Sequence, residues 1–201
     1  MAHNPVTSNS IWTGSGYLDF RAPHKATFRV ADIARGLSRR ARFSGHTIGE
    51  EPLSVARHSI CVMHMARRLD LSRDLERVAL LHDAAEAFLV DLPTPAKSLP
   101  ELAGYCEIED RLQDAIFAAF GLTAAARDWR RTVDGLDRAA LAVERAALID
   151  DPHPWPGCPG VDDTDNPHVR PESAQRDAQV FCVFATELGL PASAPVVRVG
   201  A

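Results

Sequence analysis

The residues best suited to chemistry lie on a segment whose other inward positions are apolar. Apolar side chains recur at three- and four-residue steps from Leu75. The same steps lead on to His82 and Glu86, and Asp83 stands beside His82. Burying such groups without partners costs several kcal/mol or shifts their pKa values until they are neutral. A divalent metal ion resolves this conflict, because neutral imidazole and carboxylate are its natural ligands.

Other segments repeat the pattern. A buried His82–Asp83 pair, with Glu86 in a structural ion pair, explains the first segment about as well as a metal site does. A metal site becomes the favoured explanation because His58 lies in the apolar row of a second segment and Asp137 lies in that of a third. Two nitrogens and two carboxylates on three helices can converge on one ion, with positions left open for water.

The elements that must position these residues are helices. Three- and four-residue apolar spacing predicts them over residues 30–41, 54–69, 72–90, 101–120, 132–149 and 172–188. Ser54 and Ser72 are expected N-caps, and Gly121 is an expected C-terminal residue. Because no window of strand length alternates convincingly between apolar and polar residues, the sequence predicts an all-α helical bundle.

Two stretches flank or interrupt these helices. Residues 1–27 are predicted to form an extended arm or short hairpin. Residues 151–171 are rich in proline, carry acidic residues, and are predicted to form a long loop before the last helix. Too little chain follows for a second core, so we expect a single domain over residues 1–201, with its core at about residues 30–150. Trp129 and Trp155 are interpreted as packing residues rather than as platforms on which a base stacks.

Composition excludes several classes. The chain has 201 residues, with 22 basic and 27 acidic side chains and a net charge of −5. Net acidity argues against duplex nucleic acid as a partner, and no apolar run reaches the roughly 20 residues that cross a bilayer. The four cysteines form no C-x-x-C pair, and no signal peptide is evident. We therefore expect a cytoplasmic protein without disulfides or a membrane anchor.

The order of these residues resembles the HD-domain metal-dependent phosphohydrolases. His82-Asp83-Ala84-Ala85-Glu86, followed by Asp-Leu-Pro-Thr-Pro-Ala-Lys over residues 91–97, looks like the bacterial YfbR-type 5′-deoxynucleotidases and the phage-type dATP triphosphohydrolases. Arg-Phe-Ser-Gly-His over residues 42–46 agrees with that subfamily, as does Leu136-Asp137 followed by Glu144. The resemblance extends over about residues 30–148.

The resemblance implies a role for each candidate residue. One divalent ion, which could be Mn²⁺, Co²⁺, Fe²⁺ or Zn²⁺, would be held by His58, His82, Asp83 and Asp137. Glu86 would orient or deprotonate the attacking water, and Asp91 would help to hold that water or the helix end.

The resemblance also implies substrate contacts. Arg42 and Lys97 would contact phosphate. Phe43 would lie close to the sugar, where the bacterial nucleotidase carries a tryptophan.

The implied function is hydrolysis of nucleotides, above all deoxynucleotide monophosphates or triphosphates, by a metal-activated water. One alternative is a catalytically idle HD domain that senses a nucleotide or binds a protein. Another is a cyclic-nucleotide phosphodiesterase. Relatives of this kind lead us to expect a homodimer or a larger homo-oligomer.

Overall fold

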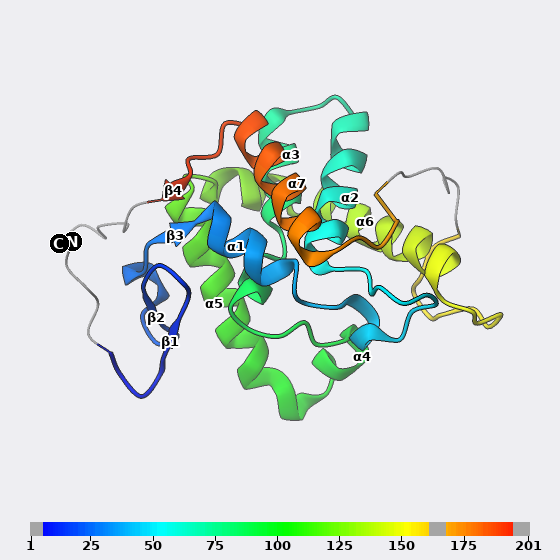
Figure 1. Ribbon diagram of the computed structural model, residues 1–201, viewed down its shortest axis with the longest axis horizontal. Helices are drawn as coiled ribbons and strands as arrows, with labels where there is room; N and C mark the ends of the chain where they lie inside the picture. Colours follow the sequence, from blue (N-terminus) through cyan, green and yellow to red (C-terminus); the bar gives the residue numbers. More distant parts are fainter. Residues whose placement is uncertain (1–5, 161–167, 195–201) are drawn as a thin grey trace.

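The computed structural model describes residues 6–160 and 168–194, and these residues are mostly helical, which confirms the all-α class (Figure 1). Their α-helices are α1 (Val30–Leu37), α2 (Val55–Arg68), α3 (Arg73–Leu81), α4 (Thr94–Lys97), α5 (Ala103–Ala119), α6 (Thr123–Leu148) and α7 (Ala174–Glu187). Two small antiparallel sheets pair β1 (Ser10–Trp12) with β2 (Tyr17–Asp19) and β3 (Phe28–Arg29) with β4 (Ser193–Ala194). The acidic residues predicted in the long loop, Asp162, Asp163 and Asp165, lie outside the described residues.

Helix α2 lies at the centre of the fold. It packs against α3, α6 and α7, and Figure 1 shows α7 lying alongside α1 and α2. Every residue from Val55 to Met63 is buried, including His58. The predicted cap is confirmed, since Ser54 Oγ accepts a hydrogen bond from the Arg57 amide. Helix α2 therefore presents a histidine inside the protein.

A buried ion pair holds the start of α2 to α7. Arg57 donates from Nε to Asp177 Oδ1 at 2.7 Å, and Ser54 Oγ donates to Asp177 Oδ2 at 2.5 Å. Because both charges are buried and hydrogen-bonded, this contact fixes the relative position of the two helices.

Helix α3 is shorter than the sequence predicts. The helix expected over residues 72–90 ends at Leu81, although its predicted cap at Ser72 is confirmed. Asp83 departs from helical geometry, with φ −105° and ψ 20°, and a short 3-10 helix follows over Ala84–Ala87. The break falls within the His82–Asp83 pair: His82 keeps helical backbone angles, and the residues from Asp83 on no longer continue α3.

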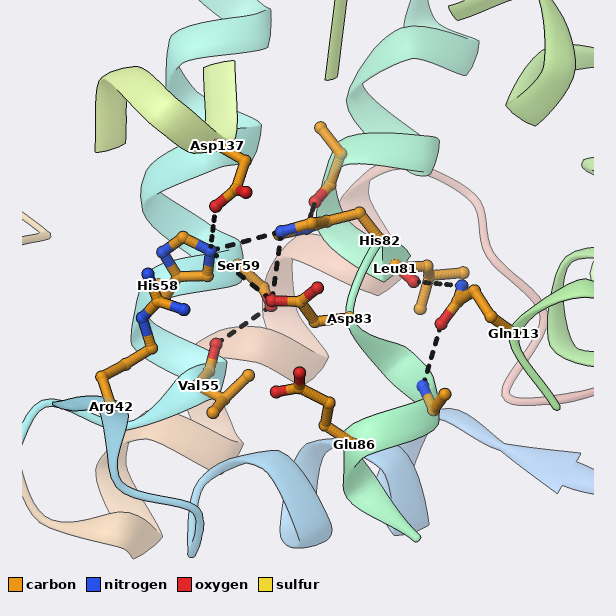
Figure 2. A network of polar contacts seen from close by, with 12 residues as sticks. Arg42, Val55, His58, Ser59, Leu81, His82, Asp83, Glu86, Gln113 and Asp137 are labelled. Carbon is orange, nitrogen blue, oxygen red and sulfur yellow. Dashed lines mark hydrogen bonds and ion pairs between the residues drawn. The ribbon is translucent and has the colours of Figure 1, made fainter. Parts of the chain in front are cut away.

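Gln113 bonds to the two backbone groups that would bond to each other if the helix were unbroken. In an unbroken α-helix the amide of Ala85 would donate to the carbonyl of Leu81. Here the Gln113 side chain from α5 lies between them, with Nε2 donating to Leu81 O at 2.8 Å and Oε1 accepting from Ala85 N at 2.9 Å (Figure 2). Both backbone groups are thereby satisfied, which stabilises the broken conformation.

Other boundaries also differ from the predictions. Helix α1 stops at Leu37 rather than at residue 41, and α6 begins at Thr123 rather than at residue 132. The first turns of α6 are largely solvent-facing, so apolar periodicity cannot reveal them. The N-terminal hairpin is confirmed by β1 and β2, whereas the β3–β4 pair carries no strand-length pattern. In the described ranges, none of the helices combines the length and the apolar character that a bilayer crossing requires.

Candidate metal centre and adjoining cavities

Four donor atoms from three parts of the chain meet at the end of α3. His58 comes from α2, His82 and Asp83 from the broken end of α3, and Asp137 from α6 (Figure 2). The His58 Nε2 atom lies 3.2 Å from His82 Nε2, 3.1 Å from Asp137 Oδ1 and 3.6 Å from Asp83 Oδ2. His82 Nε2 lies 3.2 Å from Asp83 Oδ2. The structure thus brings together the residues predicted as metal ligands.

The other ring nitrogens fix the orientation of both histidines. His82 Nδ1 lies 2.8 Å from the carbonyl of Ala79, and His58 Nδ1 lies 2.6 Å from Glu144 Oε1. Because a carbonyl only accepts, His82 donates from Nδ1, and its neutral form directs a lone pair from Nε2 into the centre. Metal-binding histidines commonly use their second nitrogen in this way. The donor set and its supporting contacts therefore fit a divalent ion.

The electrostatics of the centre favour positive charge. Burial and Arg42 oppose protonation of His58, but Glu144 and Asp137 outweigh them and raise its pKa to about 10. Burial also opposes ionisation of Asp83, yet the adjacent histidines hold the pKa of that carboxyl well below its usual range. Without a cation, protons on the imidazoles balance the charge of the carboxylates. A divalent ion bound at the centre can replace those protons.

Glu144 supports the centre from α6. Its carboxylate is fully buried, with Oε1 near His58 and Oε2 accepting from Arg42 Nη2 at 3.1 Å. Sequence analysis named Glu144 only as part of the family resemblance and gave it no function. Arg42, expected to contact phosphate, is therefore anchored at one end by Glu144.

A cavity of about 530 Å³ opens on one side of the centre. Seven of the predicted site residues line it: Arg42, Phe43, Asp83, Glu86, Asp91, Lys97 and Asp137. Two candidates remain. His58 is fully buried, and His82 lines a second cavity of about 640 Å³. Asp83 and Asp137 line both cavities, so the centre lies where the two meet.

Glu86 is a buried carboxylate with one unsatisfied oxygen. Its Oε1 accepts from Lys97 Nζ at 3.0 Å, while Oε2 is buried without a hydrogen-bond partner among the described residues. Burial, together with Asp83 and Asp91, raises the pKa of Glu86 to about 9. Lys97 also donates to Glu109 at 2.9 Å, a contact that sequence analysis missed. The ion pair matches the structural alternative for Glu86, but the free oxygen offers a place for a proton or a water.

Asp91 and Phe43 occupy the cavity wall. Burial raises the pKa of Asp91. Phe43 and Ser44 both adopt left-handed backbone conformations, with φ 53° and 52°, which are unfavourable for residues other than glycine. The Phe43 ring packs edge-on against Trp155, with centroids 6.0 Å apart. Trp129 packs against the core as predicted, whereas Trp155 lines the cavity, which sequence analysis did not foresee.

Comparisons with known proteins identify relatives but no described activity. A Rhodobacter capsulatus protein, described as uncharacterized protein RCAP_rcc00048, is 39% identical over 130 residues, which are 63% of this chain and 66% of that protein. The uncharacterized protein YfdR of Escherichia coli is 32% identical over 143 residues, which are 71% of this chain and 74% of YfdR. No protein-family model matches the chain.

Proposed function

This chain belongs to the same protein family as YfdR of Escherichia coli, and we propose that it is an HD-type, metal-dependent phosphohydrolase of nucleotides. Its expected substrates are above all deoxynucleotide mono- or triphosphates. The observation that carries the proposal is the convergence of two imidazole nitrogens and two carboxylates beside a cavity that also holds Arg42 and Lys97. A structural metal site would need neither the cavity nor the cations.

The ligand set supports a single divalent ion. His58, His82, Asp83 and Asp137 would hold it, and Mn²⁺, Co²⁺, Fe²⁺ and Zn²⁺ all suit nitrogen and carboxylate donors. When bound, such an ion polarises phosphoryl oxygens and lowers the pKa of water.

The chain's own residues would perform the remaining tasks. The Arg42 guanidinium and the Lys97 ammonium line the cavity and would balance the negative charge of the phosphate. Glu86 would hold or exchange a proton at Oε2, the oxygen that has no partner among the described residues. Asp91, on the same wall, would help to hold the attacking water.

Phosphate release tests the proposal. The purified chain, loaded with Mn²⁺ or Co²⁺, is assayed against ribo- and deoxynucleoside mono- and triphosphates and cyclic nucleotides. We expect release of phosphate or of inorganic polyphosphate that stops on chelation and resumes when metal is restored. No turnover with metal demonstrably bound would reject the proposal, and faster cleavage of cyclic nucleotides would favour a phosphodiesterase.

Homo-oligomerisation and a cytoplasmic location stay predictions. Light scattering of the purified chain tests the first.

A further inference from the structure

We propose that Trp155 is the residue on which the nucleotide base stacks, so that the chain selects substrates that carry a base. This inference rests on the proposed function and adds a specificity-determining residue to the same site. The residue comes from the loop after α6, outside the elements that supply the metal ligands.

Trp155 is not explained by packing of the fold. Within the described residues, the hydrophobic core and the partly buried side chains packed against it include neither Trp155 nor Phe43. The two rings pack on each other at an interplanar angle of 67°, and both line the cavity next to the metal centre. A large indole placed at a cavity wall and away from the core is suited to a ligand.

Polar contacts hold the indole in a defined position. Trp155 Nε1 donates to Asp151 Oδ2 at 2.8 Å, and the other oxygen of Asp151 accepts from the His153 amide at 2.9 Å. The Arg145 guanidinium lies 5.1 Å from the Trp155 ring centroid and donates to the Asp151 carbonyl at 3.0 Å. Because the ring is already fixed, stacking a base on it costs little conformational entropy.

Charge decides which cavity takes the nucleotide. Apart from the shared metal ligands, the second cavity carries Asp110, Asp114 and Asp134 against Arg127 and Arg130, an excess of carboxylates that disfavours phosphate. In the cavity with Trp155, apart from the same metal ligands, the carboxyls of Glu86 and Asp91 are matched by Arg42 and Lys97, so no excess of carboxylates opposes phosphate. At about 530 Å³ it also lies within the usual range of small-ligand sites. The phosphate and the base therefore enter on the same side of the centre.

The arrangement of the rings indicates the kind of recognition. Because Phe43 and Trp155 pack edge to face, they leave no parallel slot between them, and a base would lie on the indole face that Arg145 does not cover. Stacking of this kind tolerates every base, since each has an aromatic face. We therefore expect selection for the presence of a base rather than for one particular base.

The test compares substrates with and without a base. The metal-loaded wild-type chain is assayed on 2′-deoxyadenosine 5′-monophosphate, 2′-deoxycytidine 5′-monophosphate and 2-deoxyribose 5-phosphate, beside Trp155→Ala, Trp155→Leu and Trp155→Phe. We expect Trp155→Ala and Trp155→Leu to raise KM for both nucleotides about tenfold or more while the base-free ester changes less than about twofold. Trp155→Phe should keep most of the selectivity. Trp12→Ala, on the distant β1, is the matched tryptophan control and should leave all three substrates unchanged.

The outcomes separate this inference from the proposed function. If the wild type cleaves the base-free ester as efficiently as the nucleotides, or if Trp155→Leu slows all three substrates equally, the stacking role is wrong and the phosphohydrolase stands. If the wild type cleaves nothing with metal bound, the proposed function fails. A binding measurement then decides on Trp155 alone: in a Trp12→Phe/Trp129→Phe chain, nucleoside monophosphate should quench the remaining tryptophan fluorescence, and unchanged fluorescence overturns the inference.

Discussion

His58 and His82 approach each other through their Nε2 atoms at 3.2 Å, while their Nδ1 atoms point away to Glu144 and to the Ala79 carbonyl. Two neutral imidazoles in this arrangement would direct lone pairs at one another, which is repulsive unless a proton or a cation lies between them. Asp83 and Asp137 add negative charge to the same point. The chain therefore builds a position that requires positive charge.

Glu144 should control how strongly the centre holds its ion. Glu144→Gln removes the charge that fixes His58 and leaves Arg42 without its anionic partner. We expect metal affinity to fall by about 10- to 100-fold, as when supporting partners of metal ligands are lost elsewhere. Calorimetric titration with Mn²⁺ measures it. Asp128→Asn, an exposed carboxylate on the same helix, is the control, and equal affinities in the two variants would contradict the role of Glu144.

Glu86 should separate turnover from metal binding. Because Glu86 contributes no ligand atom to the centre, Glu86→Gln should keep the metal affinity of the wild type. Loss of its exchangeable proton should lower kcat by about 10²- to 10⁴-fold. Metal titration and phosphate release on the same preparations measure both quantities. Glu107→Gln, exposed on α5, serves as the comparison. Full activity in Glu86→Gln would exclude a catalytic part for this carboxyl.

Gln113 should couple the helix break to the metal centre. Gln113→Met preserves the length of the side chain but leaves the Leu81 carbonyl and the Ala85 amide without their partner. Each unsatisfied buried group costs about 1–3 kcal/mol, so the free energy of unfolding should fall measurably. Metal affinity should also fall, because Asp83 lies within the segment that Gln113 holds. Urea unfolding and metal titration test this, with Gln175→Met on α7 as the control. A stable variant that binds metal normally would show that the break needs no support.

The sequence predicts which helices form and which residues belong to the site. It predicts less of how those helices and residues are arranged in space. Apolar spacing locates α2, and the cap at Ser54 fixes its start. The same spacing runs without interruption through His82 and Asp83, so periodicity extends α3 past its end. The interruption depends on Gln113, some 30 residues later in the chain, and a contact at that separation leaves no local pattern. The position of Trp155 at the cavity could not be predicted for the same reason. Its contacts with Arg145 and Phe43 leave no pattern in the spacing of the sequence.

The Arg57–Asp177 pair should contribute strongly to stability. Asp177→Ala leaves a buried guanidinium without its partner and is expected to lower the free energy of unfolding by about 3–5 kcal/mol. Urea unfolding measures the change. The double variant Arg57→Met/Asp177→Leu removes both charges and should recover much of the loss. A loss that is as large in the double variant as in the single one would assign the effect to shape rather than to charge.

A stacked histidine pair should make the fold sensitive to acid. The rings of His64 and His168 lie 4.0 Å apart between centroids and contact Phe184. Burial and His64 lower the pKa of His168 from 6.5 to about 4, and burial and Arg67 lower that of His64. Between these pH values the unfolded chain binds more protons than the folded chain, so stability decreases as the pH falls through this window.

The variant His64→Phe tests this acid sensitivity. It keeps an aromatic ring in the stack and removes one titrating group, so its unfolding free energy should fall less steeply between about pH 6.5 and pH 4 than that of the wild type. Urea midpoints across this range measure the slope, with His24→Gln in the N-terminal region as the control. Parallel slopes in wild type and variant would contradict the effect.

Metal occupancy tests the central claim most directly. The chain is stripped with a chelator, dialysed against Mn²⁺ or Co²⁺ and analysed for bound metal, beside His82→Ala and Asp128→Asn. We expect one ion per chain in the wild type and in Asp128→Asn, with a Co²⁺ absorption spectrum that indicates nitrogen and oxygen ligands, and no ion in His82→Ala. A folded wild-type chain that retains no metal, or a His82→Ala chain that retains as much as the wild type, would contradict the account.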